Sequence, residues 1–299
     1  MSDRYDFLGV GGLAMDLALA VERLPIADEK YPARLVGKLP GGFIANATCA
    51  AARLGLRAGY VGWAGDDSDA DLLARDFRGW GVDPAGLARV PGEPTPFTVV
   101  ITDAAGRRAI LLPESPLYHQ PLSADHLALA RRSRVVYTYP RDPAWVEALA
   151  EAARAGGGLL ALDVESAVPL RGAALRAAIE WAGIAFVQRG ALIELGAPDL
   201  RALVRPGQWL VMTGGSAGAW GMAHGLAEPV HQPARRVEAV DTTGAGDCFH
   251  AALIAARLDG ADLAAALAFA GAAAAIKVQH RGARGGLPTR AEIEALLAG

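Results

Sequence analysis

Short runs of apolar residues alternate with longer stretches of helical spacing along most of the chain. The apolar runs have the length of buried β-strands and cover residues 7–11, 58–61, 135–139, 159–163, 184–187 and 209–213. The helical stretches cover residues 44–54, 69–80, 143–155 and 173–181. Because strands and helices alternate in this order, the pattern predicts an α/β fold with a largely parallel sheet covered on both faces.

Two stretches depart from this alternation. Residues 17–39 contain two prolines between short alternating segments, and residues 98–112 have the pattern of a β-hairpin. Neither stretch has the spacing of a strand–helix unit. Together they predict a small accessory sheet, a candidate lid formed from about residues 14–40 and 93–112.

Helical patterns return near the C-terminus and cover residues 245–258, 261–278 and 290–298. The sequence shows neither internal repeats nor a long linker. We therefore expect one domain over residues 1–299, with the lid inserted in it.

The composition narrows the classes of function. The chain has 299 residues, 52% of them hydrophobic, and a net charge of −3 without a basic run, so neither nucleic-acid nor membrane binding is expected. The longest apolar run, residues 263–276, is shorter than the roughly 20 residues of a membrane-spanning helix. Cys49 and Cys248 fit no metal spacing, and the N-terminus lacks the layout of a signal peptide, so we expect a cytoplasmic location.

A glycine-rich turn with an acidic residue at each end leads into the helical stretch 245–258. It runs Asp241-Thr242-Thr243-Gly244-Ala245-Gly246-Asp247. Backbone N–H groups at a helix N-terminus attract phosphate charge, and small residues let an anion approach closely. Asp247 would lie in the first helical turn, where a carboxylate can accept the proton of a hydroxyl that attacks a phosphate.

A single acidic residue before a helix more often only caps it and complements its dipole. Two aspartates around Thr-Thr-Gly-Ala-Gly weaken that explanation. The turn matches in full the C-terminal signature of the PfkB family, the ribokinase-like sugar and nucleoside kinases, which this chain resembles. The resemblance runs from about residue 7 to 297 and implies a three-layer α/β/α sandwich with a small β-sheet lid.

The resemblance implies a role for each residue of the turn. Asp247 corresponds to the catalytic base. The anion hole for the transferred phosphoryl group corresponds to Gly244, Ala245 and Gly246. Asp241 and Thr243 match positions where some relatives hold a monovalent cation, which makes K⁺ a candidate activator. Thr242 and Gly282 are expected beside the nucleotide, Gly282 in a loop that closes the adenine and cation site.

On the substrate side, Gly41 and Gly42 permit a tight turn, and Asn46 offers both a donor and an acceptor to a sugar hydroxyl. Alone, this pattern is more typical of an ordinary glycine-rich helix start. Because the same sequence also contains the Asp247 turn, this pattern resembles the N-terminal signature of the PfkB family. Asp16 similarly resembles the family aspartate that binds two substrate hydroxyls, although alone it would more often be a turn or cap residue.

Two further residues are candidates for the sugar side. Phe97 falls in the second lid segment, where it either faces the sugar or packs inside the lid. Arg141 follows the strand 135–139, at the edge where α/β sheets bind ligands, although a surface arginine is an equal alternative.

On the nucleotide side, Thr213, Gly215 and Gly218 match the family's Thr-x-Gly-x-x-Gly loop, which lies along ATP; a tight turn without a ligand is the alternative. One feature is missing. Relatives such as ribokinase have Asn-x-x-Glu after the strand 184–187, where this chain has Gln188 and Ala191. Mg²⁺ is still expected with ATP, because the phosphates need a counter-charge during transfer.

Three other kinds of protein compete with a kinase. Residues 214–218 also spell the G-x-S-x-G elbow of α/β hydrolases, with Ser216 as nucleophile, provided that a helix follows. Residues 9–14 resemble a dinucleotide fingerprint, which likewise requires a following helix. A non-catalytic sugar-binding protein would keep Asp16 and Asn46 but would have no use for Asp247.

The favoured hypothesis is an ATP-dependent kinase that phosphorylates a hydroxyl of a small sugar. The sequence around 76–83 and 95–110, with the missing Asn-x-x-Glu, is most similar to ketohexokinase and sulfofructose kinase relatives. Fructose-like ketoses therefore come first, and nucleosides are the alternative substrate class. Since lid sheets of this family often pair, the resemblance also implies a homodimer.

Overall fold

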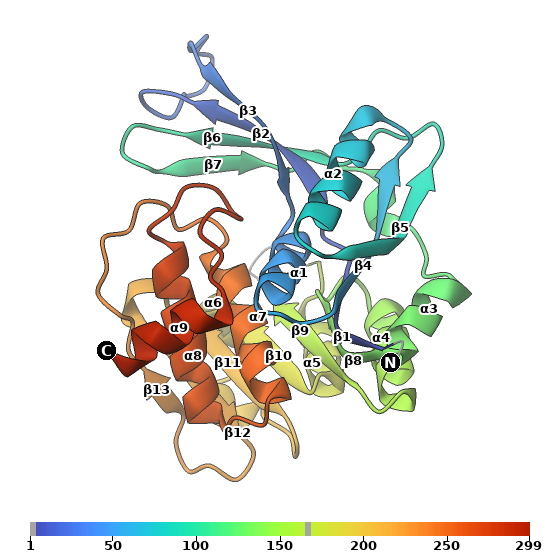
Figure 1. Cartoon of the computed structure of the whole chain (residues 1–299), viewed down its shortest axis with the longest axis vertical. Helices are drawn as coiled ribbons and strands as arrows, with labels where there is room; N and C mark the ends of the chain where they lie inside the picture. The colour runs from blue at the N-terminus through green and yellow to red at the C-terminus, as the bar shows by residue number, and fades with distance from the viewer. Residues whose placement is uncertain (1–3, 165–168) are drawn as a thin grey trace.

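The structure is a computed structural model that describes residues 4–164 and 169–299. Within these residues, a nine-stranded sheet forms the centre of the protein (Figure 1). Its order is β13 (Val230–Gln232), β12 (Ala219–Ala223), β11 (Trp209–Thr213), β10 (Ile184–Val187), β9 (Leu159–Val164), β8 (Ser133–Thr138), β1 (Tyr5–Val10), β4 (Ala58–Gly65) and β5 (Asp83–Val90). In this order, each strand from β11 to β5 is parallel to its neighbours within that range. In contrast, β12 is antiparallel to β11, and β13 is antiparallel to β12.

Helices cover both faces of this sheet. One face carries α1 (Phe43–Arg53), α2 (Ser68–Gly79), α7 (Ala245–Leu258), α8 (Leu263–Lys277) and α9 (Arg290–Ala298). The other carries α3 (Ala124–Arg131), α4 (Pro143–Ala155), α5 (Gly172–Trp181) and α6 (Arg189–Glu194). Because strand side chains alternate between faces, Phe7 packs in the first core and Leu8 in the second. The predicted three-layer α/β/α fold is confirmed.

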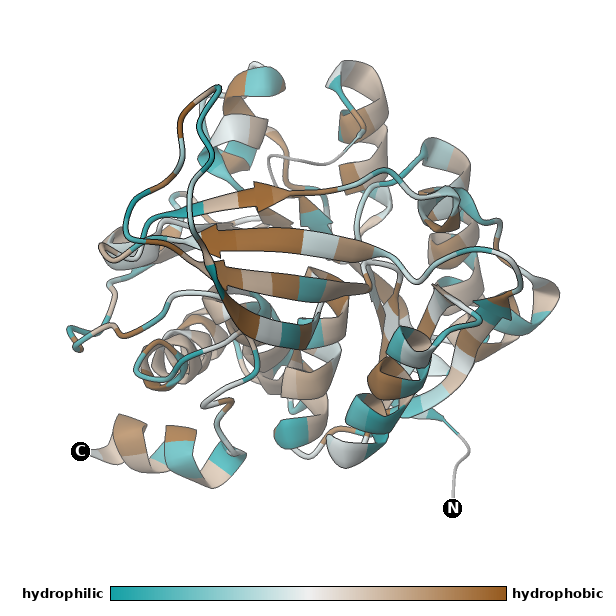
Figure 2. Cartoon of the chain, turned by 90° about the horizontal axis from the view of Figure 1, so that it is seen from above, coloured by the Kyte–Doolittle hydropathy of each residue, from teal (hydrophilic) through white to brown (hydrophobic). Residues whose placement is uncertain are grey.

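A second sheet of four strands stands apart from the central one. Its order is β3 (Arg34–Gly41), β2 (Ala14–Ala20), β6 (Phe97–Thr102) and β7 (Arg108–Leu111). Figure 2 shows hydrophobic residues along much of these strands. Several of them are more than 40% exposed: Leu35, Val36, Leu39, Ile110 and Leu111. This second sheet therefore presents an apolar surface that the described chain leaves uncovered.

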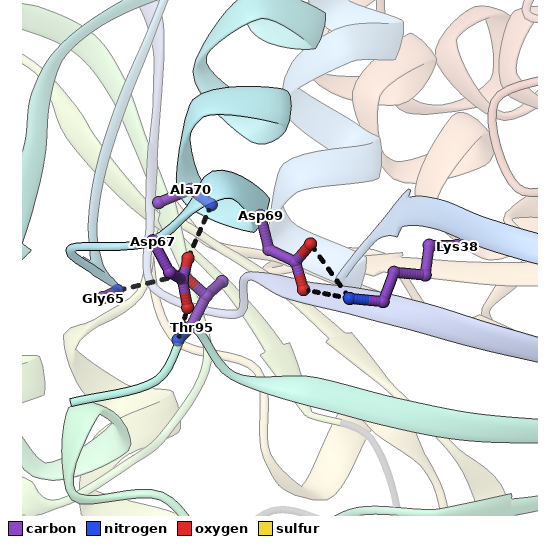
Figure 3. A network of polar contacts seen from close by, with 6 residues as sticks. All are labelled: Lys38, Gly65, Asp67, Asp69, Ala70 and Thr95. Atoms are coloured by element: carbon purple, nitrogen blue, oxygen red, sulfur yellow. Dashed lines mark hydrogen bonds and ion pairs between the residues drawn. The ribbon is translucent and has the colours of Figure 1, made fainter.

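Polar contacts join this second sheet to the start of α2 (Figure 3). The Asp67 carboxylate accepts hydrogen bonds from the Thr95 backbone N–H at 2.8 Å and the Thr95 hydroxyl at 2.6 Å. Burial alone would raise the pKa of Asp67, but these bonds hold it below its usual value. On β3, Lys38 forms an ion pair with Asp69 of α2 at 2.8 Å. The start of β6 and one edge of the second sheet are thus tied to the main domain.

Several observed elements are absent from the predicted pattern, among them β5 and α3. β5 contains Pro84 and Gly86, which disfavour a central strand but are tolerated at the sheet edge where β5 lies. The short helix α3 begins at Ser123, which forms a reciprocal capping box with His126. In the described part of the chain, none of the helices combines the length and the hydrophobicity that crossing a bilayer requires.

Candidate active site

The glycine-rich turn forms the N-terminus of α7, as predicted. Gly244 caps the helix with φ 75°, a left-handed conformation that favours glycine. A side chain here would also overlap the Ala283 carbonyl oxygen of the loop after α8. Both the backbone angle and the close approach therefore require glycine at position 244.

The three residues proposed for the anion hole differ in what their backbones contact. The Ala245 N–H donates to the Thr242 carbonyl at 3.2 Å, so it is engaged within the turn. Gly246 is exposed, and a Cβ added there would meet open space. An anion can therefore approach the start of α7 from the Gly246 side, where the helix dipole favours negative charge.

Asp247 and Asn46 meet directly across two helices. Asn46 Nδ2 of α1 donates to Asp247 Oδ2 of α7 at 2.9 Å. Both residues are buried, with exposed fractions of 6% for Asn46 and 7% for Asp247. The candidate base and a predicted sugar-binding residue, 201 positions apart in sequence, thus form one site.

A buried arginine that the sequence analysis missed holds Asn46 in place. Arg284 Nε donates to Asn46 Oδ1 at 3.0 Å, and the same guanidinium pairs with the Asp76 carboxylate. A further bond reaches the Gly41 carbonyl at 3.3 Å. Since Arg284 is bound to Asn46 Oδ1, the Asn46 amide presents only N–H donors to Asp247 and to a ligand.

Asp16 lies at the base of the second sheet. Its carboxylate accepts a hydrogen bond from the Thr98 hydroxyl of β6 and touches Gly41, where a side chain would overlap it. Burial raises the pKa of Asp16, although the Thr98 bond and the nearby Arg284 charge oppose this rise. Gly42 has φ 91° and leaves no space for a Cβ beside the Gly12 carbonyl. The contacts of Asp16 with Thr98 and Gly41 therefore bring β2, β3 and β6 together.

The other two sugar-side candidates are Phe97 and Arg141. Phe97 is 42% exposed and pairs in register with Met15, whereas Thr98 is the β6 residue that contacts Asp16. The Arg141 guanidinium donates a hydrogen bond to the Gln120 carbonyl at 2.9 Å and lies 3.9 Å from the centroid of the Trp145 ring. Arg141 lines a small pocket with Gly11, Gly12 and aromatic side chains. Arg141 thus borders a hollow at the end of β1.

The loop after β11 follows the predicted nucleotide motif. Thr213 ends β11, Gly215 has φ 57° and Gly218 has φ 94°. A strand, β12, follows this loop, so the hydrolase elbow around Ser216 lacks the helix that it requires. The dinucleotide fingerprint fails for the same reason, because residues 9–14 lead into the strand β2.

Asp241 forms hydrogen bonds with Thr243 inside the turn and with the loop after α8. Asp241 Oδ1 accepts from the Thr243 N–H at 2.9 Å and the Thr243 hydroxyl at 2.6 Å. Its Oδ2 accepts from the Gly282 N–H at 2.9 Å. Lys277 Nζ donates to the Asp241 carbonyl at 3.1 Å. Each oxygen of Asp241 thus already accepts an N–H or O–H donor, so a metal ion bound here would share these oxygens with the turn, the Gly282 N–H or Lys277.

A second arginine missed from the sequence reaches the turn from the second sheet. Arg108 of β7 hydrogen-bonds to the hydroxyl of Thr243 and, at 3.3 Å, to that of Thr242. It places a guanidinium beside the turn that leads into α7, and Thr242 lies 134 residues away in sequence. A basic residue in a hairpin gives no sequence signal of this contact, which only the tertiary structure creates.

The sequence matches the pfkB family of carbohydrate kinases over residues 7–290. The chain belongs to this family. This PfkB protein is similar to the ATP-dependent ribose-1-phosphate kinase of Halopiger xanaduensis, with 30% identity and 97% coverage of each chain. It is also similar to fructokinase-1 of Zea mays, with 30% identity and 96% coverage of each chain.

A solved structure shares the fold. Arabidopsis thaliana ribokinase, complexed with ribose and ATP, superposes with a TM-score of 0.86, 26% identity and 99% coverage of each chain. The fold and the family together make this PfkB protein a sugar kinase. Two of the motifs that predicted the family, around Asn46 and Asp247, meet at the start of α7.

Proposed function

We propose that this kinase transfers the terminal phosphoryl group of ATP to a hydroxyl of a small sugar, with Asp247 as general base. The observation that carries the proposal is the buried Asn46–Asp247 contact, beside the open start of α7. A carboxylate held there can take the proton of the attacking hydroxyl. The N–H groups of Gly244 and Gly246 and the dipole of α7 would stabilise the charge on the transferred group.

The sugar would lie between Asp16 and Asn46. The Asp16 carboxylate accepts from sugar hydroxyls, while the Asn46 amide donates to a sugar oxygen. Because Arg284 fixes the amide, the hydroxyl beside Asp247 would be held in one orientation, which lowers the entropic part of the barrier. Gly41 leaves room for the Asp16 carboxylate, and Gly42 leaves room for the Gly12 carbonyl, so both glycines permit the packing that holds Asp16 in place.

ATP would lie along the Thr213–Gly218 loop, with its phosphates at the start of α7 and Thr242 and Gly282 nearby. Mg²⁺ would neutralise phosphate charge during transfer. In residues 4–164 and 169–299, no group of three His, Cys, Asp or Glu side chains could hold a metal ion. Mg²⁺ would therefore be held chiefly by the phosphates and water, as is usual for this ion.

The second sheet would act as a lid. Arg108 already bridges it to the phosphate-binding turn, so closure over the sugar would add positive charge beside the transferred group. Closure would also exclude water and suppress ATP hydrolysis. The exposed apolar residues of this sheet support pairing with a second copy of the chain as a homodimer.

For the acceptor we propose a fructose-like ketose. Support comes from the similarity to a fructokinase and from the pairing of an acceptor, the Asp16 carboxylate, with a donor, the Asn46 amide, which suits a pair of sugar hydroxyls. The test is transfer of labelled phosphate from ATP across a panel of ketoses, aldoses, ribose 1-phosphate and nucleosides. Transfer to a ketose that Asp247→Asn abolishes and Ser216→Ala preserves supports the proposal. Transfer only to nucleosides would refute the ketose, and transfer to none would refute the kinase assignment.

A further inference from the structure

The chain contains three lysines, and one of them is completely buried. Lys277, the last residue of α8, has an exposed fraction of 0%. Burying an ammonium group is unfavourable unless its charge meets suitable partners. Neither the core packing nor the proposed chemistry described so far requires a lysine at this position.

The ammonium of Lys277 joins two backbone segments that surround the phosphate-binding turn. Its Nζ donates to the Asp241 carbonyl at 3.1 Å and to the His280 carbonyl at 3.4 Å. The Asp241 carboxylate in turn accepts from the Gly282 N–H at 2.9 Å. Two carbonyl oxygens that face one positive charge resemble the coordination of a small monovalent cation, supplied here by a side chain.

The charges around Lys277 fit this role. Burial lowers its pKa, while the carboxylates of Asp241 and Asp247 oppose that change. The positive charge of Arg108, which reaches the turn from the second sheet, also lowers the pKa of Lys277. The ammonium thus contacts the Asp241 end of the turn and is near enough to both acidic residues of the turn to interact with their charges.

A metal ion would compete for the same oxygens. The Asp241 carbonyl is taken by Lys277, and both carboxylate oxygens of Asp241 already accept hydrogen bonds. The hydroxyl of Thr243 donates to Asp241 and accepts from Arg108. A monovalent ion at Asp241 and Thr243 would therefore have to share oxygens that these contacts already engage, and it would lie beside the positive charge of Lys277.

We propose that the Lys277 ammonium is a built-in cation that organises the phosphate-binding turn, so that this kinase needs no monovalent metal ion for activity. The inference rests on the proposed function, because it assigns Lys277 to the turn that would bind the ATP phosphates. It makes Lys277 a positioning residue, which acts through the backbone of Asp241 and not by contact with the substrate.

The experiment compares the protein in potassium chloride, sodium chloride and tetramethylammonium chloride at equal ionic strength. The variant Lys277→Met keeps the length of the side chain and removes its charge. Lys30→Met changes an exposed lysine and is the matched control. Binding of Mg–ATP by calorimetry and turnover of the best sugar are both measured, with circular dichroism to confirm folding.

For the wild type and Lys30→Met, replacing potassium should change ATP affinity and turnover by less than about twofold. Lys277→Met should lose about tenfold in both in tetramethylammonium, and potassium or ammonium ions should restore part of the loss. A wild type that needs potassium for activity would overturn the proposal, even if Lys277→Met does not fold. So would a folded Lys277→Met with unchanged ATP affinity.

The two proposals can fail separately. ATP affinity reports on Lys277 even if no sugar of the panel is phosphorylated. An Asp247→Asn variant that still transfers phosphate would refute the general base without changing the cation dependence.

Discussion

Replacing Arg284 by methionine should destabilise the protein and slow its turnover together. The substitution keeps the buried stem but leaves the Asp76 carboxylate and Asn46 Oδ1 without their donor. Breaking one side of a buried ion pair costs about 3–5 kcal/mol. Since the Asp76 side chain is 25% exposed, water replaces part of the lost pairing, and we expect a loss of about 2–4 kcal/mol in the free energy of unfolding.

Turnover should fall as well, because the freed Asn46 amide can rotate and release the Asp247 carboxylate. A loss of about tenfold in kcat corresponds to one misplaced catalytic contact. The free energy of unfolding is measured by urea titration, and kcat by a coupled assay on the best sugar. Arg284→Lys should recover part of the stability through its charge, but less of the turnover, because lysine cannot reproduce the fixed guanidinium geometry.

The control is Arg205→Met, which removes the ion pair to Glu180 on the surface. There the side chains are 55% and 40% exposed, so the expected loss is below about 1 kcal/mol. If Arg284→Met is no less stable than Arg205→Met and turns over at the wild-type rate, then Arg284 does not hold the site together.

Three further substitutions test other parts of the site. Gly244→Ala should lower kcat while the circular dichroism spectrum stays close to that of the wild type, because a methyl group at φ 75° meets the Ala283 carbonyl and displaces the turn. An unchanged kcat would contradict this. Thr98→Val should raise KM for the sugar and move the acid limb of kcat/KM to higher pH. The reason is that the lost hydrogen bond helps to keep the pKa of Asp16 down, so an unmoved limb would argue against Asp16 as a ligand. Arg108→Ala should lower kcat by about tenfold with little change in thermal stability, since its contacts are exposed; equal kcat would remove Arg108 from the mechanism.

The sequence predicts well where local signals are strong. The observed bounds of α4, α7 and α9 are the predicted ones. For α4, Pro143 at the first helical position and the Asp142 cap set the start, and glycine follows the end. Strands β10 and β11 also begin and end as predicted, because each is a short apolar run between polar residues.

Long-range contacts account for what the sequence does not reveal. Arg284 lies 238 residues from Asn46 and 208 from Asp76, and Arg108 lies 135 from Thr243. Each is one of many arginines, and only the packing of α8, the second sheet and the turn brings its partners within reach. The buried Lys277 follows an alanine-rich helical stretch that by itself predicts an ordinary buried helix.

In β6 the structure adds Thr98 to the candidate site beside the predicted Phe97. Side chains alternate along β6, and Thr98 is the residue bonded to Asp16. The register between β2 and β6 pairs Asp16 with Thr98 and so decides that Thr98 is the β6 residue beside Asp16.

The most direct test of the account is single-turnover phosphate transfer by Asp247→Asn, which keeps the shape and removes the basic carboxylate. With labelled ATP and the best sugar in excess, the rate of sugar phosphate formation should fall by about a thousandfold or more, while the affinity for Mg–ATP stays within a few-fold of the wild type. A transfer rate within about tenfold of the wild type would show that another group accepts the proton.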